Sequence, residues 1–137
     1  GLETAIELYT KEFEQRNRIK IYLEMDSNII IAPEASLIIF RIMQEALTNI
    51  ARYAEATSVK IMLSKKGDNI DFSISDNGIG IGEDKVLSKN SFGIISMKER
   101  AASLGGALKI YREDNRFTVV NLFFPYKNKG TNENFDL

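Results

Sequence analysis

The chain has 137 residues, 44% of them hydrophobic and 27% charged, which is the composition of one globular domain and excludes disordered, collagen-like and coiled-coil chains. Its 18 basic and 19 acidic residues leave a net charge of -1, so no charge excess favours nucleic-acid binding. Cysteine and histidine are absent, which excludes disulfides, thiolate nucleophiles, histidine bases and metal sites built from either residue.

Apolar periodicity predicts two helices and a strand in the first part of the chain. Helical spacing covers about residues 2–16, and alternation over residues 19–25 indicates a half-buried strand. Residues 29–31 form a short apolar run that we expect to be buried. A second helix is expected from Pro33, a residue type favoured in the first helical turn, to about Tyr53. Because this helix is apolar on most of its surface, we expect it at the centre of the core.

The rest of the chain is expected to add a hairpin, a long loop, a helix and a second strand pair. The loop runs from Asp76 to about Ser91, a length typical of a lid or a binding loop. Helix-spaced apolar residues follow over 94–104, and Gly105 with its neighbouring glycine is typical of a helix C-cap. Four strands are predicted from alternating apolar residues, at 59–63, 70–74, 108–112 and 117–124.

This order of elements predicts an α+β fold, with helices on one face of a mixed, mostly antiparallel sheet. Residues 1–126 are expected to form one domain and the polar residues 127–137 a disordered tail. No apolar run approaches the ~18 residues of a membrane span, and the start of the chain lacks the features of a signal peptide. We therefore expect a cytoplasmic protein without direct membrane contact. The start without Met suggests a piece cut from something longer, and a cloning scar would give the same start.

Residues 76–80 (DNGIG) follow directly after a predicted strand. Asn-Gly is common in ordinary turns, so this motif alone is a weak sign of function. Glycines also let the backbone approach a flat ligand closely, because no Cβ intervenes. The carboxylate of Asp76 only accepts hydrogen bonds, which suits the exocyclic amine of adenine and not the carbonyl of guanine.

Glu45, Asn49 and Arg52 lie at i, i+4 and i+7 and so share one face of the long helix, with Tyr53 beside them. For any single one of them, a solvated stripe is the simpler explanation. Together they are unusual on an apolar helix. Asn49 offers a neutral oxygen for Mg²⁺ when phosphates supply the negative charge, and Arg52 offers a cation for phosphate. Tyr53 offers a ring beside a base, and Glu45 a group to polarise water or complete the metal shell.

The third motif is residues 91–97 (SFGIISM), where a glycine-containing loop is expected to run into a helix. Free N–H groups at such a junction attract phosphate. Taken alone, the segment is better explained as a plain helix start with Phe92 in the core.

In this order, the three motifs resemble those of the ATP-binding catalytic (HATPase) domain of bacterial two-component sensor histidine kinases. Residues 40–49 (FRIMQEALTN) resemble its N box, residues 76–80 its G1 box and residues 91–100 (SFGIISMKER) its G2 box. The strings QEALTN and MKER…LGG are most similar to the subfamily whose response regulators usually carry helix-turn-helix output domains. The resemblance covers about residues 1–125 and implies the two-layer α/β sandwich (Bergerat fold) of the gyrase and histidine kinase ATPase superfamily.

The resemblance implies a role for each matching residue. Asn49 would hold Mg²⁺, and Asp76 would accept a hydrogen bond from the adenine amine. Glu45, one turn before Asn49, would be the catalytic base, and Thr118 would close the adenine site. The other implied nucleotide-binding residues are Arg52 near phosphate, Tyr53 beside the base, Gly78, Gly80 and Ile81 in the pocket wall, and Phe92, Gly93 and Ile94 in an ATP lid.

The chain also departs from the family pattern. Serines replace the commoner glycines at two lid positions, phenylalanine replaces a glycine in the last strand, and tyrosine replaces this subfamily's usual histidine: Ser91, Ser96, Phe117 and Tyr53. Because Asn49 and Asp76 are retained, we expect nucleotide binding to survive.

The implied function is to bind Mg-ATP and to donate its γ-phosphoryl group to a histidine on a separate dimerisation domain, since this chain contains no histidine. The implied partners are that domain and a response regulator, within a sensor kinase of a kind that is often membrane-anchored. Two alternatives stay open. One is a serine kinase of the anti-sigma-factor type on the same fold. The other is a degenerate nucleotide-sensing interaction module, for which the departures from the pattern would be the evidence.

Overall fold

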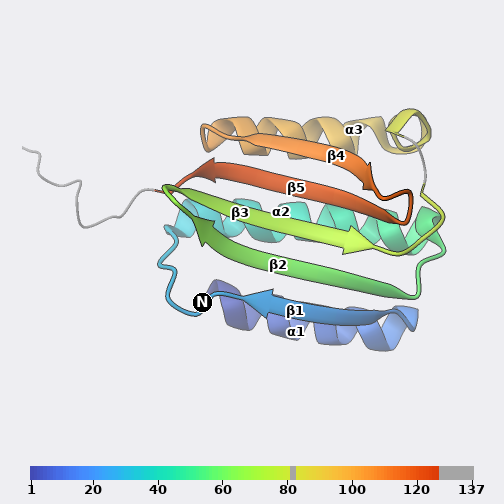
Figure 1. The fold of residues 1–137 in the computed structure, drawn as a ribbon, viewed down its shortest axis with the longest axis horizontal. Coiled ribbons are helices and arrows are strands. Elements are labelled where there is room, and N and C mark those ends of the chain that lie inside the picture. The colour runs from blue at the N-terminus through green and yellow to red at the C-terminus, as the bar shows by residue number, and fades with distance from the viewer. Residues whose placement is uncertain (81–82, 127–137) are drawn as a thin grey trace, which may run out of the picture.

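The computed structural model describes residues 1–80 and 83–126, with the helix backbone alone over residues 83–91. The described residues form three α-helices, a short π-helix (η1) and five strands (Figure 1). In chain order these are α1 Leu2–Asn17, β1 Lys20–Met25, α2 Pro33–Asn49, η1 Ile50–Ala54, β2 Ser58–Lys66, β3 Asn69–Asp76, α3 Glu83–Ser103, β4 Ala107–Glu113 and β5 Phe117–Pro125.

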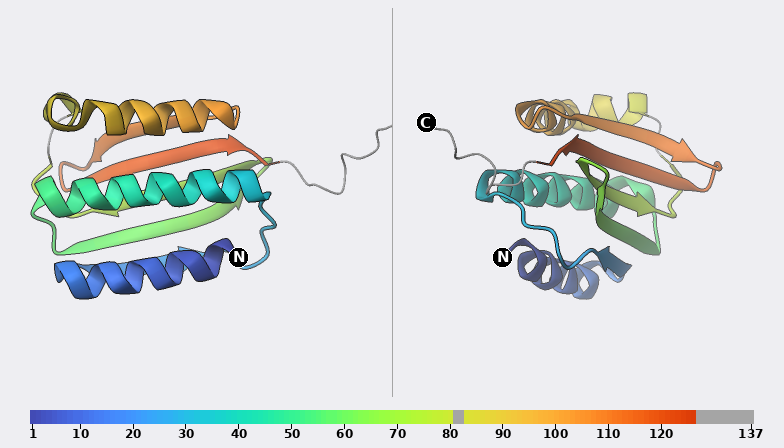
Figure 2. Two further views of the ribbon diagram at one scale, coloured as in Figure 1. Left: turned by 180° about the vertical axis from the view of Figure 1, so that it is seen from behind. Right: turned by 60° about the vertical axis from the view of Figure 1, so that its left-hand side comes forward.

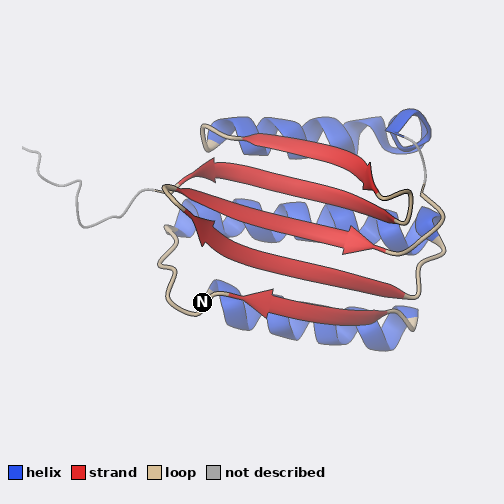
Figure 3. Ribbon diagram, in the orientation of Figure 1, coloured by secondary structure: helices blue, strands red, loops and turns tan. Residues whose placement is uncertain are grey.

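The five strands form one sheet in the order β1-β2-β3-β5-β4 (Figure 3). β1 pairs with β2 in parallel, with α2 in the connection between them, and the other pairings are antiparallel. All three α-helices cover the same face of the sheet (Figure 2). The expected α+β architecture, two layers with a mixed and mostly antiparallel sheet, is therefore confirmed.

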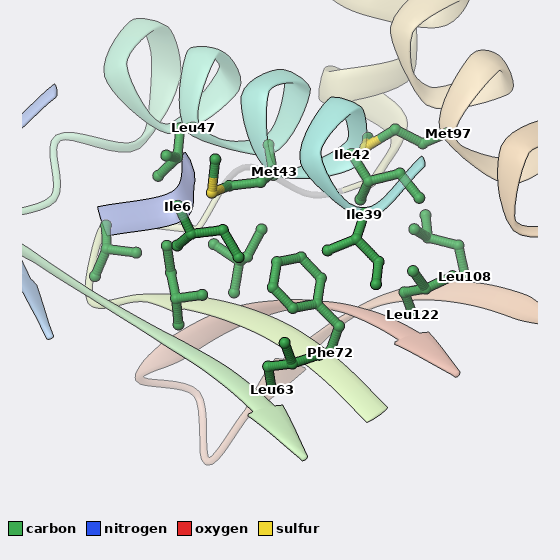
Figure 4. Close-up of a cluster of buried hydrophobic side chains, with 14 of the residues drawn as sticks. Ile6, Ile39, Ile42, Met43, Leu47, Leu63, Phe72, Met97, Leu108 and Leu122 are labelled. Atoms are coloured by element: carbon green, nitrogen blue, oxygen red, sulfur yellow. The ribbon is translucent and has the colours of Figure 1, made fainter. Parts of the chain in front are cut away.

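The core lies between the helices and the sheet (Figure 4). Because side chains alternate along a strand, Ile70, Phe72 and Ile74 of β3 point toward the helices, where each is at most 1% exposed. Asp76 is the next residue of this row and is also buried. The register that builds the core thus carries a carboxylate to the helix side of the sheet. The fully buried residues that α2 contributes opposite are Ile39, Ile42, Met43 and Leu47.

The ends of two helices position the segments around this carboxylate. α2 passes into the π-helix η1 after Asn49, and Glu55 ends η1 in the left-handed conformation with φ 55°. This confirms the expected helix end near Tyr53, although the π-helical turn, a feature found frequently at functional sites, was not predicted. Gly105 has φ 74° after α3, which confirms the predicted C-cap.

Two sequence predictions are wrong. The loop predicted over residues 76–91 is much shorter, because α3 begins at Glu83. Residues 83–92 contain neither glycine nor proline and start with two acidic residues, which favours a helix. The apolar run at 29–31 is not buried as a unit, since Ile30 is 71% exposed. It belongs to a connection at the surface, where water satisfies the backbone polar groups. The predicted tail, residues 127–137, lies outside the described residues.

Candidate functional site

A pocket opens at the carboxyl end of β3, the right-hand end of that strand in Figure 1. Its cavity volume is about 50 Å³. Pockets that hold small molecules typically measure about 300–1,000 Å³, so a ligand of that size would extend beyond this cavity. Its lining is mainly apolar and comes from both layers: Ala46, Asn49, Ile50, Tyr53, Ala54, Asp76, Ile94, Met97, Ile110, Thr118 and Val120.

Asp76 is the acidic group of this pocket. It is 4% exposed, and one carboxylate oxygen accepts a hydrogen bond from the N–H of Gly78 at 2.8 Å. Burial raises the pKa of Asp76 above its ordinary value, while the Gly78 N–H and the Arg112 guanidinium act in the opposite direction. Among the described residues the other buried polar side chain is Thr10, whose hydroxyl bonds to its own helix. A buried acid in a pocket is a candidate for function.

The backbone that follows Asp76 packs directly against η1. The N–H of Ile79 donates to the carbonyl oxygen of Ala54 at 2.8 Å. A Cβ on Gly78 would overlap that same oxygen and would lie 2.8 Å from the Ala54 Cβ. Glycine is therefore required at position 78 by the close approach of two backbones.

Asn77 ties the same loop to the start of β2. Its side-chain oxygen accepts hydrogen bonds from the N–H groups of Thr57 and Ser58 at 2.9 and 3.0 Å, and its amide donates to the Thr57 hydroxyl at 2.9 Å. These bonds hold the loop against the start of β2. Asp76 is thus followed by a segment that is fixed to both η1 and the start of β2.

Thr118 and Arg112 complete the sheet side of the site. Thr118 is the register partner of Asp76 across β3 and β5, and both line the pocket. The Thr118 hydroxyl oxygen accepts a hydrogen bond from Nη1 of Arg112 at 2.9 Å. The same nitrogen lies 3.2 Å from the carbonyl oxygen of Gly78. Arg112 therefore connects β4, β5 and the glycine loop.

Asn49 and Tyr53 approach from the helix side. Asn49 is the last residue of α2, and Tyr53 lies one turn later in η1. The structure thus brings together predicted site residues from five elements, of which only α2 and η1 are adjacent in the sequence: Asn49, Tyr53, Asp76, Ile94 and Thr118.

Other predicted residues lie near the pocket without lining it. Glu45 is half-buried on α2, and Arg52 is exposed in η1. Gly78 and Gly80 lie behind the pocket wall, where Gly80 has φ 77° and faces the Arg112 guanidinium. Their predicted roles remain predictions.

The predicted lid residues lie in α3. Ile94 is buried and lines the pocket, and Gly93 is buried beside it. Phe92 is 86% exposed, so the alternative that placed it in the core is wrong. The helical periodicity explains this, because Phe92 lies on the outer side of a helix that buries Ile94 and Met97. Ile81 lies outside the described residues.

Arg112 and most of the apolar residues that line the pocket were not predicted from the sequence. Arg112 continues the inward row of Leu108 and Ile110 on β4, so the alternation contained a signal for a charged residue facing the helices. Ala54 had no comparable signal, because its role depends on a backbone carbonyl.

Two features are absent from the described residues. No group of three or more acidic, histidine or cysteine side chains is placed to hold a metal ion. A cation at this site would therefore need most of its ligands from elsewhere, such as phosphate oxygens. No helix of the described part of the chain is long and apolar enough to cross a membrane.

Comparison with known proteins identifies relatives along most of the chain. The family model of the histidine kinase-, DNA gyrase B- and HSP90-like ATPases matches residues 34–128. The sensor histidine kinase LiaS of Bacillus subtilis is 33% identical over 136 residues, 97% of this chain and 37% of its own length. The oxygen sensor histidine kinase NreB of Staphylococcus carnosus is 32% identical over 126 residues, 91% of this chain and 36% of its own length. The chain thus spans little more than a third of these relatives.

Solved structures show the same fold. The histidine kinase domain of a blue-light activated histidine kinase from Erythrobacter litoralis superposes with a TM-score of 0.76 at 21% identity, over 91% of this chain and 61% of that one. The histidine kinase AdeS of Acinetobacter baumannii gives 0.74 at 16% identity, over 93% and 64% of the two chains.

Proposed function

The chain belongs to the histidine kinase-, DNA gyrase B- and HSP90-like ATPase family, and from this premise we propose that it binds Mg-ATP and donates the γ-phosphoryl group to a histidine outside this chain. The observation that carries the proposal is the meeting of Asp76, Thr118 and Asn49 at one pocket, each from a different element. A buried carboxylate that only accepts hydrogen bonds selects a base with an exocyclic amine. The apolar remainder of the pocket suits the flat faces of that base.

Asn49 is proposed as the protein ligand of Mg²⁺. Its amide oxygen is neutral, and the described residues supply no acidic cluster that would bind the cation without a nucleotide. This donor set fits a magnesium ion held mainly by phosphates, where it neutralises charge during phosphoryl transfer. The part of this chain is to orient the nucleotide: Asp76 and Tyr53 at the base and Asn49 toward the phosphates.

The acceptor of the phosphoryl group is proposed to be a histidine on a dimerisation domain of the same kinase. This chain contains no histidine, and the relatives are sensor histidine kinases about three times its length. In that arrangement the catalytic work of this domain is positioning and charge neutralisation, with Glu45 as the candidate base. The phosphoryl group would then pass to a response regulator. We further propose that the domain lies in the cytoplasmic part of the kinase.

Calorimetric titration with ATP, with and without Mg²⁺, tests the binding proposal. Wild type is expected to bind Mg-ATP, Asp76→Asn to lose binding and Asn49→Ala to lose the Mg²⁺ dependence. Asp71→Asn is the matched control, because Asp71 lies on the same strand but on the opposite face, where it bonds to Asn121 at 2.9 Å. No binding by the wild type, wild-type binding that does not depend on Mg²⁺, or an Asn49→Ala variant that binds as the wild type does would favour the degenerate sensing module.

Phosphotransfer assays test the acceptor. The isolated chain is expected to hydrolyse ATP slowly at best and to phosphorylate an added histidine-bearing dimerisation domain. Transfer to a serine acceptor instead would support the serine-kinase alternative, which the names of the relatives do not favour. Robust ATP turnover without any acceptor would contradict the proposal.

A further inference from the structure

Resting on the proposed function, we propose that Arg112 is a positioning residue that sets the preference of this site for adenine over guanine, by fixing which way the Thr118 hydroxyl donates its hydrogen. Arg112 does not line the pocket itself. It acts through Thr118, which does.

The placement of Arg112 is unusual for a charged side chain. The inward row of β4 consists of Leu108 and Ile110 and then Arg112, which is half-buried. A charged group that points toward the core side is retained only when its polar atoms find partners. Arg112 finds three acceptors: the Thr118 hydroxyl at 2.9 Å, the Gly78 carbonyl at 3.2 Å and the Asn115 carbonyl at 3.4 Å.

The chemistry of these partners imposes a direction on the Thr118 hydroxyl. A guanidinium has only donors, so the bond of 2.9 Å makes the Thr118 oxygen an acceptor toward Arg112. The single hydrogen of the hydroxyl must then point elsewhere, and Thr118 lines the pocket beside Asp76. To a ligand the pocket can therefore offer an acceptor, the ionised Asp76 carboxylate, beside a donor, the Thr118 hydroxyl.

This pair matches adenine and opposes guanine. The adenine edge carries a donor, its exocyclic amine, next to an acceptor, ring nitrogen N1. The guanine edge carries the reverse, a carbonyl acceptor next to an N1–H donor, so it would face acceptor with acceptor and donor with donor. Sites that leave buried polar groups unpaired discriminate strongly against the wrong ligand.

Arg112 also acts on Asp76, the acceptor of the pair. A Cβ on Gly80 would lie 2.6 Å from the guanidinium carbon of Arg112, so the side chain lies directly against the glycine loop. Its positive charge lowers the pKa of Asp76 against the effect of burial. Arg112 thus favours the ionised, acceptor-only form of Asp76 and the donor orientation of Thr118 together.

The test compares affinities for Mg-ATP and Mg-GTP in wild type, Arg112→Gln and Arg112→Lys. Glutamine is shorter, carries no charge and can accept as well as donate, so Thr118 becomes free to turn, and the ratio of ATP to GTP affinity is expected to fall at least tenfold. Lysine only donates, so the ratio is expected to stay within about threefold of wild type. Arg116→Gln is the matched control, because Arg116 is exposed and stacks on Phe117 at 5.2 Å.

Thr118→Val provides a second measurement that does not depend on whether the Arg112→Gln variant folds normally. It is expected to lower the same ratio, and adding Arg112→Gln to it should lower the ratio no further. The inference fails if Arg112→Gln weakens ATP and GTP equally, which is the result for a purely structural role, or if Thr118→Val keeps the wild-type ratio. Failure of the wild type to bind ATP would instead refute the proposed function, so the two failures are distinguishable.

Discussion

Replacing Gly78 by alanine tests whether the loop after β3 is held rigidly against η1. The new Cβ would overlap the carbonyl oxygen of Ala54 and would lie 2.8 Å from both the carbonyl carbon and the Cβ of that residue. None of these atoms can be moved by a side-chain rotation. Either the two backbones separate, or the bond of 2.8 Å from the Ile79 N–H to Ala54 breaks.

The expected loss of stability combines three effects. Overpacking costs about 1–3 kcal/mol, and loss of one hydrogen bond adds about 0.5–1.5 kcal/mol. Alanine also reduces the entropy of the unfolded chain, which offsets about 0.4–1 kcal/mol. Because Gly78 does not have a positive φ, left-handed strain adds nothing. The free energy of unfolding should therefore fall by about 0.5–4 kcal/mol. ATP binding should weaken as well, since the Gly78 N–H positions the Asp76 carboxylate.

Urea denaturation followed by circular dichroism, together with ATP titration, measures both effects. Gly67→Ala is the matched control: Gly67 has φ 61° in the β2–β3 turn, and nothing lies within 4 Å of the added Cβ. Its cost should be the left-handed strain alone, about 1–2 kcal/mol, with ATP affinity unchanged. The reasoning would be refuted if Gly78→Ala unfolded within about 0.5 kcal/mol of wild type and bound ATP normally.

Three further predictions concern stability. Burial raises the pKa of Asp76, so its neutral form stabilises the fold at low pH, and this contribution is lost as pH rises through the folded-state pKa. Asp76→Asn should therefore be more stable than wild type at pH 7, and the difference should shrink as pH falls. A constant difference across a pH series of urea titrations would contradict this. Asn77→Ala should lower the free energy of unfolding by about 1–2 kcal/mol, because it removes the acceptor of two N–H groups. Asn77→Asp should lower it less, because it keeps that acceptor. Equal losses in urea titrations would contradict this role of the Asn77 oxygen. Phe92→Ala should change the free energy of unfolding by less than about 0.5 kcal/mol, because Phe92 is exposed. Met97 is only 1% exposed, so Met97→Ala should lower the free energy of unfolding by about 2–5 kcal/mol. Thermal melts showing the reverse order would mean that α3 is oriented differently.

The periodic parts of the fold were predictable because each depends on neighbours in the sequence. The alternation of Ile70, Phe72 and Ile74 indicated β3, and the same alternation extended to Asp76. α1, β1, β4 and β5 were found in the same way. The loop over residues 76–91 was predicted wrongly because glycines near its ends were given more weight than the glycine-free run between them, where α3 begins at Glu83.

The candidate site was predictable in its polar residues and not in its construction. Asn49 and Asp76 carry side chains whose chemistry is visible in the sequence, and Thr118 was implied by the family resemblance. The requirement for glycine at position 78 has its cause in the carbonyl of Ala54, a backbone atom that carries no sequence signature. The π-helical turn that places Ala54 there is likewise a consequence of packing.

The sequence by itself thus determined most of the regular elements, which chemistry is excluded and which carboxylate and amide are available to a ligand. The tertiary structure decided which of these groups share a pocket and which atoms orient them. Arg112 shows the reason most directly. Its neighbours in the sequence predict only an inward position on β4, whereas its bonds to Thr118 and Gly78 exist because β5 and the glycine loop meet there. Contacts between segments distant in the chain follow from the packing of the whole fold, which local periodicity does not encode.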